Sequence, residues 1–472
     1  MTGMSEKTFE AIAPDALKRL VDIVGDRNLV TSEEDMEPYS RDETEDLRFM
    51  PEAVAKPATA EEVSRIMKLA SAARFPVTPR GGGTGLSGGA LPVHGGLVLS
   101  TERMKTIEEI DERNLTATAA AGVVTEELQN EVEKRDLFYP PDPASRGSCT
   151  LGGNVAECAG GPRALKYGVT GDYVLGVEAV LPDGTTLRTG KKLYKDAAGY
   201  NLTRLLSGSE GTLAVVTRVI LRLLPLPVFR RTLLVPFDSI EKAAGCVRRL
   251  FMNRIVPCSA EFMDRQAVEL AENKLGRKAP VDPGEALLLL EVDGSDLEAL
   301  QREYEKMGGI CLEAGANDVL VAESSEKQNL MWDIRRAVGE AVKAISVYKE
   351  EDTVVPPAEL PELVSGIRDV ARAHGIIAVC YGHAGDGNIH CNILKGGMSD
   401  ERWRTALPAA VREIHGRAVA LGGSITGEHG VGFTQKPFLT TALSQAEIAL
   451  MKRIKNAFDP LGILNPGKIF PD

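Results

Sequence analysis

Residues 80–90, RGGGTGLSGGA, contain six glycines, and this density limits how the surrounding chain can fold. The glycines at positions 83, 85 and 88 match the G-x-G-x-x-G pattern that binds a dinucleotide in a Rossmann fold. That fold requires a helix directly after the third glycine, but the next residues read GALPVHGGLVLS. A proline and a glycine pair this close together prevent a helix of useful length, so the sequence excludes a Rossmann fold here.

A glycine-rich loop without the Rossmann helix still has a use, because it exposes backbone N–H groups with few side chains in the way. Such loops form anion-binding concavities and allow the backbone to approach a phosphate. Two further glycine-rich segments follow in the same region, TLGGNVAECAGG at 150–161 and SGSEGTL at 207–213. Three such loops favour one long, phosphate-bearing ligand over three unrelated turns, although the loops alone do not name it.

The region up to residue 225 mixes short strands with helices, which predicts an α+β domain. Its opening predicts a helix over about 8–25, and Thr59 with Glu62 forms a capping box for a second helix that follows. The runs PVTP, GLVLS, TATAAAG, VLGVEAVLP and LAVVTRVILRLLP are expected as strands.

The next region, 228–320, shows a more regular order in which strand, helix and strand occur twice. RTLLVPF, VPCSAEFMD and ALLLLEVDG are expected as strands, and ICLEAG (310–315) is expected to close the series as another strand. This order predicts a ferredoxin-like antiparallel sheet. A helical region over 325–345 and a C-terminal helix that ends before Pro460 complete the pattern.

Composition excludes several classes of function. The net charge of −12 argues against a nucleic-acid partner, whose phosphate backbone would be repelled. No apolar run approaches the roughly 20 residues of a transmembrane helix, and the first residues lack the features of a signal peptide. The seven cysteines are scattered and show no C-x-x-C spacing, so we expect reduced thiols in the cytoplasm and no iron–sulfur cluster.

Three of the six histidines fall in two compact motifs, YGHAGDGNIHCN (381–392) and GGSITGEHGVGF (422–433). In the first motif, the dipeptide Asp386-Gly387 predicts a type I′ hairpin that pairs His383 directly with His390. Directly paired residues share one face of the strands, with Cβ atoms roughly 5 Å apart. Such imidazoles can share a divalent metal, or they can be two partly exposed hairpin histidines, and this motif alone leaves both interpretations open.

The second motif offers a carboxylate, Glu428, next to a third histidine. Together with His383 and His390, Glu428 would give two nitrogen ligands and one oxygen ligand with open positions, which is typical of a catalytic metal site. His429 would point another way if the segment is extended. The alternative is a solvated Glu-His pair in a glycine-rich loop.

The segments PVTPRGGGTGLSGGA, PPDPASRGSCTLGGNVAECAGGPRALKYGVTGDYVLGVEAVLPDGT and LLSGSEGTLAVVT together resemble the FAD-binding domain of the vanillyl-alcohol-oxidase superfamily. The resemblance spans about 40–470 and is strongest to the branch of D-lactate dehydrogenases, the flavin subunit of glycolate oxidase and D-2-hydroxyglutarate dehydrogenase. It implies an α+β fold with a PCMH-type FAD-binding domain at 1–225. A ferredoxin-like substrate or cap domain at 226–415 and a C-terminal segment at 416–472 that returns to the flavin site would follow.

The resemblance also implies which residues hold FAD. Several relatives attach the flavin to a histidine in the first glycine loop, and Thr84 stands at that position here, which implies non-covalent FAD. The implied FAD contacts are Pro79, Arg80, Gly81, Gly82, Gly83, Thr84, Gly85, Leu86, Ser87, Pro141, Thr150, Leu151, Gly152, Gly153, Asn154, Gly160, Gly161, Glu210, Gly211 and Asn465.

In metal-dependent members of this family, the positions of His383, His390 and Glu428 bind a divalent cation, for which Zn, Mn and Fe are the candidates here. The same members use the position of His429 as the catalytic base. The resemblance therefore favours the metal interpretation over the two alternatives given above.

Substrate contacts follow from the same family pattern. Matches to MWDIRRAV and VYKEEDTVVP imply that Arg335 and Lys349 bind carboxylate groups. Asn392 follows His390 by two residues, so it would share the same strand face and contact the substrate. Hydroxyglutarate-oxidising relatives carry a threonine where this chain has Gly339, and this departure favours a smaller acid such as lactate or glycolate.

Together these observations predict an FAD-dependent, metal-assisted dehydrogenase that converts a short 2-hydroxy acid into the 2-keto acid. D-lactate or glycolate is favoured over D-2-hydroxyglutarate. An external carrier would take the electrons: an electron-transferring flavoprotein, an iron–sulfur subunit that could tie the protein to a membrane, or a quinone pathway. A homodimer is compatible with the sequence. The alternatives are a non-catalytic flavin subunit of a larger oxidase complex and a sugar or phenol oxidase on the same fold.

Overall fold

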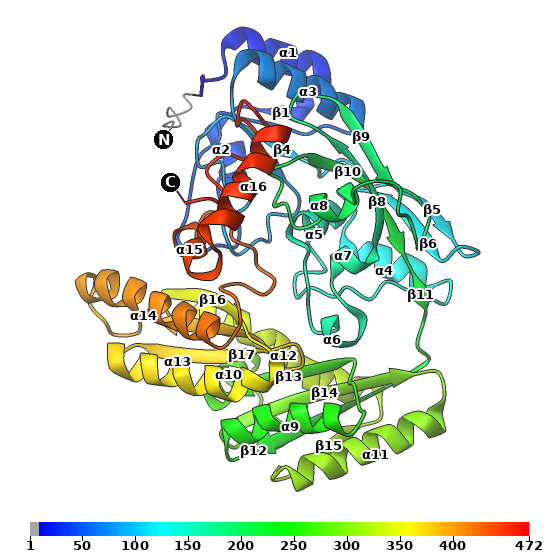
Figure 1. Cartoon of the computed structure of the whole chain (residues 1–472), viewed down its shortest axis with the longest axis vertical. Helices are drawn as coiled ribbons and strands as arrows, with labels where there is room; N and C mark the ends of the chain where they lie inside the picture. The colour runs from blue at the N-terminus through cyan, green and yellow to red at the C-terminus, as the bar shows by residue number, and fades with distance from the viewer. Residues whose placement is uncertain (1–8, 472) are drawn as a thin grey trace. The chain divides into compact units, whose positions relative to one another are not determined.

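The computed structural model describes residues 9–471, which divide into two compact units (Figure 1). The first unit comprises the chain up to Ala159 together with 169–226 and the residues from Glu428 onward. The second unit comprises 160–168 and 227–427, so most of it is inserted into the chain of the first. This grouping differs from the sequence-based ranges, because 160–168 and 416–427 belong to the second unit.

The first unit contains two larger sheets and one small strand pair. The four-stranded sheet runs in the order β1 (Leu29–Val30), β2 (Ala53–Ala55), β4 (Leu97–Ser100), β3 (Val77–Arg80), with β2, β4 and β3 parallel. The five-stranded antiparallel sheet runs β5 (Ile107–Asp111), β6 (Thr116–Ala120), β10 (Val215–Arg222), β8 (Val174–Val180), β9 (Thr186–Gly190). Strands β7 (Leu137–Phe138) and β11 (Leu224–Pro225) form the pair.

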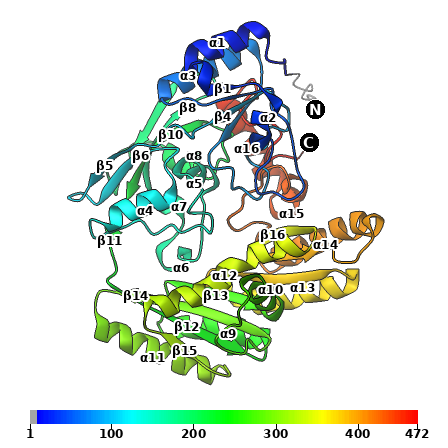
Figure 2. The ribbon, with the colours of Figure 1, turned by 180° about the vertical axis from the view of Figure 1, so that it is seen from behind.

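Two helices, α1 (Pro14–Val24) and α3 (Ala60–Ala73), lie side by side in both views of the first unit (Figures 1 and 2). The predicted cap of α3 is confirmed, because Thr59 Oγ1 accepts a hydrogen bond from the Glu62 N–H at 3.1 Å. The helix expected from residue 8 begins only at Pro14, whose fixed φ suits a first turn. Thr8 lies outside the described residues.

The end of the chain completes the core of the first unit. After α16 (Gln445–Phe458), Ile463 and Leu464 are buried among apolar residues of α3, β3 and β4. The Val77 N–H donates to the Ile463 carbonyl at 2.8 Å, and the Asn465 N–H donates to the Val77 carbonyl at 2.7 Å. Shorter helices of this unit are α2 (Glu33–Met36), α4 (Thr125–Glu133), α5 (Leu151–Glu157), α7 (Thr170–Tyr173), α8 (Leu202–Leu206) and α15 (Leu439–Ala442).

The second unit is built on one antiparallel sheet of seven strands. Its order is β15 (Leu320–Ala322), β12 (Phe229–Phe237), β14 (Ala286–Gly294), β13 (Ser259–Asp264), β17 (Ile377–His383), β18 (Asn388–Leu394), β16 (Tyr348–Val354). Counted along the chain, β12, β13, β14 and β15 are the first to fourth strands of this group, and their order in the sheet is fourth, first, third, second. This is the ferredoxin-like arrangement. Strands β17, β18 and β16 extend that sheet and carry the histidine hairpin.

Helices cover both faces of this sheet. Helices α10 (Arg265–Leu275) and α12 (Ser325–Ile345) pack on the face that includes Leu289, Met263 and Tyr381. The alternate residues of the same strands point to the other face, where α9 (Ile240–Met252), α11 (Leu297–Glu313), α13 (Leu360–His374) and α14 (Asp400–Ala420) contact the strands. The segment 160–168 contributes α6 (Ala164–Tyr167) to this unit.

The strand expected at 310–315 is wrong, because helix α11 continues through Glu313. Its buried residues include Leu300, Met307, Ile310 and Cys311, and this spacing keeps one helical face against the sheet. A short apolar run such as ICLEAG does not distinguish a buried strand from the last turn of a buried helix. The fourth strand of the series is instead β15. None of the helices within 9–471 is both long and apolar enough to cross a bilayer.

Candidate functional site

The three glycine-rich segments lie against one another in the first unit. A Cβ atom on Gly82 would overlap the Ser148 carbonyl oxygen. The backbone of the first loop therefore lies directly against the backbone that leads into the second glycine-rich segment. A Cβ atom on Gly211, in the third loop, would lie 3.5 Å from Pro79 Cγ, where strand β3 leads into the first loop. The fold therefore brings these loops together, as a single long ligand would require.

The second of these segments is helical rather than an open loop. Thr150 caps helix α5, and its Oγ1 accepts a hydrogen bond from the Gly153 N–H at 3.4 Å. The Asn154 side chain donates to Thr125 Oγ1 at 2.7 Å, so it helps to hold this helix in place. Gly160 and Gly161, which were expected to contact the same ligand, belong to the second unit.

Glu210 and Asn465 connect the glycine loops with the C-terminal segment. The Glu210 carboxylate accepts hydrogen bonds from the N–H groups of Val431 and Gly432 at 2.9 and 2.6 Å. The Asn465 side chain donates to the carbonyls of Gly89 and Glu210 at 3.0 and 2.8 Å. Both side chains, which were expected to contact FAD, therefore hold the surrounding loops together.

Several buried ionisable groups surround these contacts. Burial raises the pKa of Glu157 well above its ordinary value, and the nearby charges of Glu210 and Asp42 add to that shift. Burial lowers the pKa of Lys468 to about 7, although Asp42 and Glu210 oppose the change. The Lys468 ammonium donates to the Leu91 carbonyl at 2.6 Å, so it anchors the chain just after the first glycine loop.

In the second unit, β17 and β18 form the hairpin that carries His383 and His390. Its register pairs His383 with Asn388 and Tyr381 with His390, so the expected direct pairing of the two histidines is wrong. Residues 384–387 therefore form a four-residue loop. A two-residue type I′ turn would need a positive φ at both Asp386 and Gly387, but only Gly387 has one (81°).

The two imidazoles nevertheless share one face of the sheet, because His390 lies two residues beyond the partner of His383. Their ring centroids are 5.2 Å apart, and the rings are nearly perpendicular. A ring nitrogen of one lies within 4.8 Å of a ring nitrogen of the other. Both side chains are buried, at 6% and 5% exposure, so this pair is not the exposed pair of the alternative interpretation.

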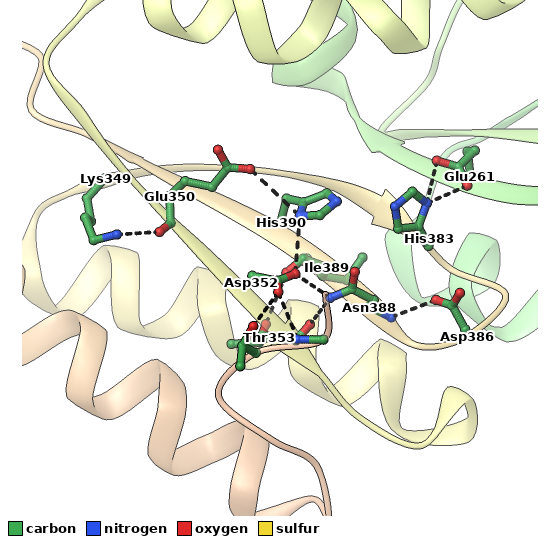
Figure 3. A network of polar contacts seen from close by, with 12 residues as sticks. Glu261, Lys349, Glu350, Asp352, Thr353, His383, Asp386, Asn388, Ile389 and His390 are labelled. Carbon is green, nitrogen blue, oxygen red and sulfur yellow. Dashed lines mark hydrogen bonds and ion pairs between the residues drawn. The ribbon is translucent and has the colours of Figure 1, made fainter. Parts of the chain in front are cut away.

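Glu261, at the centre of β13, faces the same site and was not predicted from the sequence. Its carboxylate oxygens lie 2.8 and 3.0 Å from His383 Nδ1 (Figure 3), and one of them accepts a hydrogen bond from Arg335 Nε at 2.8 Å. Burial opposes ionisation of Glu261, but its contacts with His383 and Arg335 hold its pKa below the ordinary value. An acidic residue amid the buried, largely apolar strand SAEFMD was the signal that could have identified it.

Strand β16 supplies two more carboxylates next to His390. Its Nδ1 lies 3.5 Å from Asp352 and 3.8 Å from Glu350 (Figure 3). Asp352 also accepts hydrogen bonds from the Asn388 side chain at 2.7 Å and from the Gly427 N–H at 2.9 Å. Asp352 therefore connects the histidine hairpin with the segment that leads into Glu428.

The structure brings two of the three predicted substrate-binding residues to this face. Arg335, on α12, lies over the ring of Tyr381 at 4.9 Å from its centroid and is bonded to Glu261. Asn392 is 1% exposed and follows His390 on the same face, and its amide meets no hydrogen-bond partner of good geometry among residues 9–471.

Lys349 does not join this group. It pairs with Ile393, whose side chain alternates with those of His390 and Asn392, so Lys349 points toward the opposite face of the sheet. Its ammonium donates to the Glu350 carbonyl at 2.8 Å (Figure 3). The expectation from the motif VYKEEDTVVP placed a lysine in the site, whereas strand alternation places Glu350 and Asp352 there.

Glu428 and His429 begin the last segment of the first unit. Glu428 follows Gly427 directly, so their Cα atoms are about 3.8 Å apart across one peptide bond. Asp352 binds the Gly427 N–H, and Glu210 binds the N–H groups of 431 and 432. The backbone on both sides of these two residues is therefore held by buried carboxylates.

Comparisons with known proteins agree with this architecture. The model of an FAD binding domain matches residues 51–190, and the model of the C-terminal domain of FAD linked oxidases matches residues 226–469. The chain is 42% identical over 463 residues to the glycolate oxidase subunit GlcD of Bacillus subtilis (strain 168), with 97% of each chain covered. It is 35% identical over 475 residues to the D-lactate dehydrogenase of Anaerostipes hadrus, with 99% of each covered.

Among solved structures, p-cresol methylhydroxylase has a similar fold. The TM-score is 0.80 at 16% identity, with 97% of this chain and 96% of that chain covered. At this identity the likeness concerns the fold alone.

Proposed function

This chain belongs to the FAD-linked oxidases, and from that membership we propose that it oxidises a short 2-hydroxy acid, D-lactate or glycolate, with the help of a divalent metal ion. It is an FAD-linked oxidoreductase with a PCMH-type FAD-binding domain of the vanillyl-alcohol-oxidase type. The observation that carries the proposal is the buried face of the second unit, where two imidazoles and a guanidinium meet.

The first unit fits FAD, because its glycine loops lie so close together that an added Cβ atom would collide with neighbouring backbone. Thr84 supports non-covalent binding, since it offers no imidazole to the flavin. When bound, FAD would accept the hydride released from the substrate Cα, and a divalent cation would lower the pKa of the substrate hydroxyl.

Replacing Gly82 by alanine is expected to lower the FAD content of the purified protein strongly, because the new methyl group would collide with the Ser148 carbonyl oxygen. The flavin-to-protein absorbance ratio measures this loss. Gly245→Ala on α9 is the control, because no heavy atom lies within 4 Å of a Cβ there and the residue belongs to none of the glycine loops. If both variants retain FAD equally well, the close approach of the two segments is not what the cofactor requires.

The second unit fits a cation, because His383 and His390 offer ring nitrogens within 4.8 Å of each other in a buried setting. His383 Nδ1 is held by Glu261, which leaves Nε2 as the ligand atom. Glu428 would complete a set of two nitrogen ligands and one oxygen ligand, and this set leaves positions for the substrate. Zn, Mn and Fe are the candidate ions.

Protein side chains would bind the substrate and remove its hydroxyl proton. Arg335 would bind the substrate carboxylate with its terminal nitrogens, and Asn392 would donate to a substrate oxygen. His429, as a neutral imidazole, would take the hydroxyl proton while the Cα–H bond breaks and the 2-keto group forms. The buried position of Arg335 and Asn392 supports this assignment, because a bound acid would satisfy hydrogen-bonding groups that are shielded from water.

Gly339 supports a short acid as the substrate. It lies one turn after Arg335 on α12, and it has no side chain for a second, distal carboxylate. A Cβ atom there would already lie 3.4 Å from the Tyr381 hydroxyl oxygen.

Anaerobic reduction of the flavin with a panel of acids tests the proposed function. D-lactate or glycolate is expected to bleach the flavin absorbance fastest, D-2-hydroxyglutarate and D-malate more slowly, and L-lactate at a negligible rate. Failure of every acid to bleach the flavin would indicate a non-catalytic subunit. Rapid peroxide formation from a sugar or phenol in air would indicate an oxidase of that class.

The electrons would leave through an external carrier, an electron-transferring flavoprotein or an iron–sulfur subunit. One relative is named as a subunit of glycolate oxidase, which supports a protein partner. A cytoplasmic location and a homodimer stay predictions.

A further inference from the structure

We infer that Glu261 is a positioning residue that orients the His383 imidazole and the Arg335 guanidinium with a single carboxylate. The inference rests on the proposed function, in which His383 binds the cation and Arg335 binds the substrate carboxylate. Glu261 would thus orient a metal ligand and the carboxylate-binding guanidinium together, so that neither is positioned independently of the other.

The position of Glu261 makes it available to both residues, and the Ser259 hydroxyl on the same strand also donates to it at 3.4 Å. Strand β13 pairs with β17 so that Glu261 stands directly opposite His383, and Arg335 approaches from α12 above the same face. The Glu261 side chain is fully buried, at 0% exposure. Water therefore cannot replace its partners, and an unpaired carboxylate there would be strongly unfavourable.

The contact with His383 selects one tautomer. An ionised carboxylate can only accept hydrogen bonds, so His383 must carry a proton on Nδ1, which lies 2.8 and 3.0 Å from the two Glu261 oxygens. In the neutral ring the lone pair is then on Nε2, the atom that a cation would bind. Carboxylates in this second layer typically fix ring orientation and raise the basicity of the ligand nitrogen.

The contact with Arg335 fixes a planar group in two ways. The bond from Nε to Glu261 restrains one edge of the guanidinium, and the ring of Tyr381, 4.9 Å from the guanidinium carbon, restrains its plane. The terminal nitrogens are then oriented for a bidentate contact with the substrate carboxylate. Loss of Glu261 would release the imidazole and the guanidinium at the same time.

A nearby residue provides a matched control. Glu291 on the neighbouring strand β14 is also buried, at 4% exposure, and faces α12 from the same side of the sheet. Its carboxylate accepts hydrogen bonds from Trp332 Nε1 at 2.8 Å and from Thr232 Oγ1 at 3.0 Å. Glu291→Gln therefore disturbs a buried carboxylate under the same helix without touching His383 or Arg335.

The test compares Glu261→Gln with Glu291→Gln in the full-length, FAD-loaded protein. We expect Glu261→Gln to weaken Zn²⁺ or Mn²⁺ affinity, measured by competition with a chelating dye, by about 10- to 100-fold. Glu291→Gln should leave that affinity within about twofold of the parent. Equal weakening in both variants, or parent affinity in Glu261→Gln, would overturn the inference.

Nitrogen-15 spectra of the histidine rings in the metal-free protein provide a second, independent readout. We expect the parent to show His383 protonated on Nδ1, with its signals identified by their loss in His383→Asn. Protonation on Nε2 in the parent would overturn the inference even if Glu261→Gln does not fold. If the parent binds no divalent metal, the proposed metal assistance fails, while the tautomer still decides the role of Glu261.

Discussion

Replacing His429 by alanine is expected to lower kcat by about 10²- to 10⁴-fold, the usual contribution of a positioned general base. The alcohol proton of a 2-hydroxy acid must leave as the Cα–H bond breaks, and His429 is the imidazole that the proposed function assigns to this proton. The FAD content should remain that of the parent, because the loop contacts made by Glu210 and Asn465 do not involve the His429 side chain. Stopped-flow measurement of anaerobic flavin reduction gives the rate directly.

His374→Ala is the control for that variant. His374 lies at the end of α13, which packs on the face of the sheet opposite to His383 and His390, and its Nε2 is 3.1 Å from Glu413. We expect parent kcat in His374→Ala. A His429→Ala variant that reduces its flavin at the parent rate would exclude His429 as the base.

Removal of divalent metal is expected to slow substrate-driven flavin reduction by about 10³-fold, since a cation that polarises the substrate oxygen contributes several kcal/mol to the transition state. Dialysis against a chelator, followed by elemental analysis, prepares the metal-free protein. Reduction by dithionite should be unaffected, because it needs no polarised hydroxyl. Added Zn²⁺, Mn²⁺ or Fe²⁺ should restore the rate and thereby identify the ion that the protein uses.

Substitution of either hairpin histidine sharpens this experiment. His383→Ala and His390→Ala should lose activity to a similar extent, and added metal should not rescue them, because each removes one imidazole ligand. Parent activity in a chelated sample that contains no measurable metal would contradict metal assistance. The FAD assignment would stand in that case.

Local signals in the sequence predicted many elements well. The helix expected over 325–345 matches α12 residue for residue, and the run ALLLLEVDG matches β14. The first shows a helical period over 21 residues, and the second is a short apolar run bounded by Pro283-Gly284 and Gly294, which favours a strand. The N-cap at Thr59 also fixed the start of α3, because a cap depends on residues only three apart, although the Glu62 carboxylate accepts from the Ala58 N–H rather than from the Thr59 N–H of a capping box.

Features that depend on distant residues were not predictable in this way. The ICLEAG run turned out to be helical because the sheet buries its Ile310 and Cys311 on one face of α11, which the run itself does not reveal. The Asp386-Gly387 turn is wider than expected, and the Gly387 carbonyl accepts a hydrogen bond at 3.0 Å from the Val355 N–H, a partner outside the hairpin.

The same limit applies to the candidate site. Sequence patterns identified His383, His390 and Arg335, but the residue that links two of them, Glu261, lies 122 positions before His383. Its partners become visible only once strands β13 and β17 are paired. Lys349 was misplaced for a related reason, since one residue of strand register decides which face of the sheet a side chain occupies.

The order in which a ribosome makes this chain has a consequence for how the first unit matures. The N–H and carbonyl of Val77 in strand β3 bond to residues 463 and 465, and Asn465 bonds to Gly89 across 376 positions. The residues of the second unit are synthesised before residues 463–465, whereas the first unit keeps part of its apolar surface uncovered until those residues are added. A change at residues 463–465 is therefore expected to disturb strand β3 and the glycine loop that follows it as directly as a change in the glycines themselves.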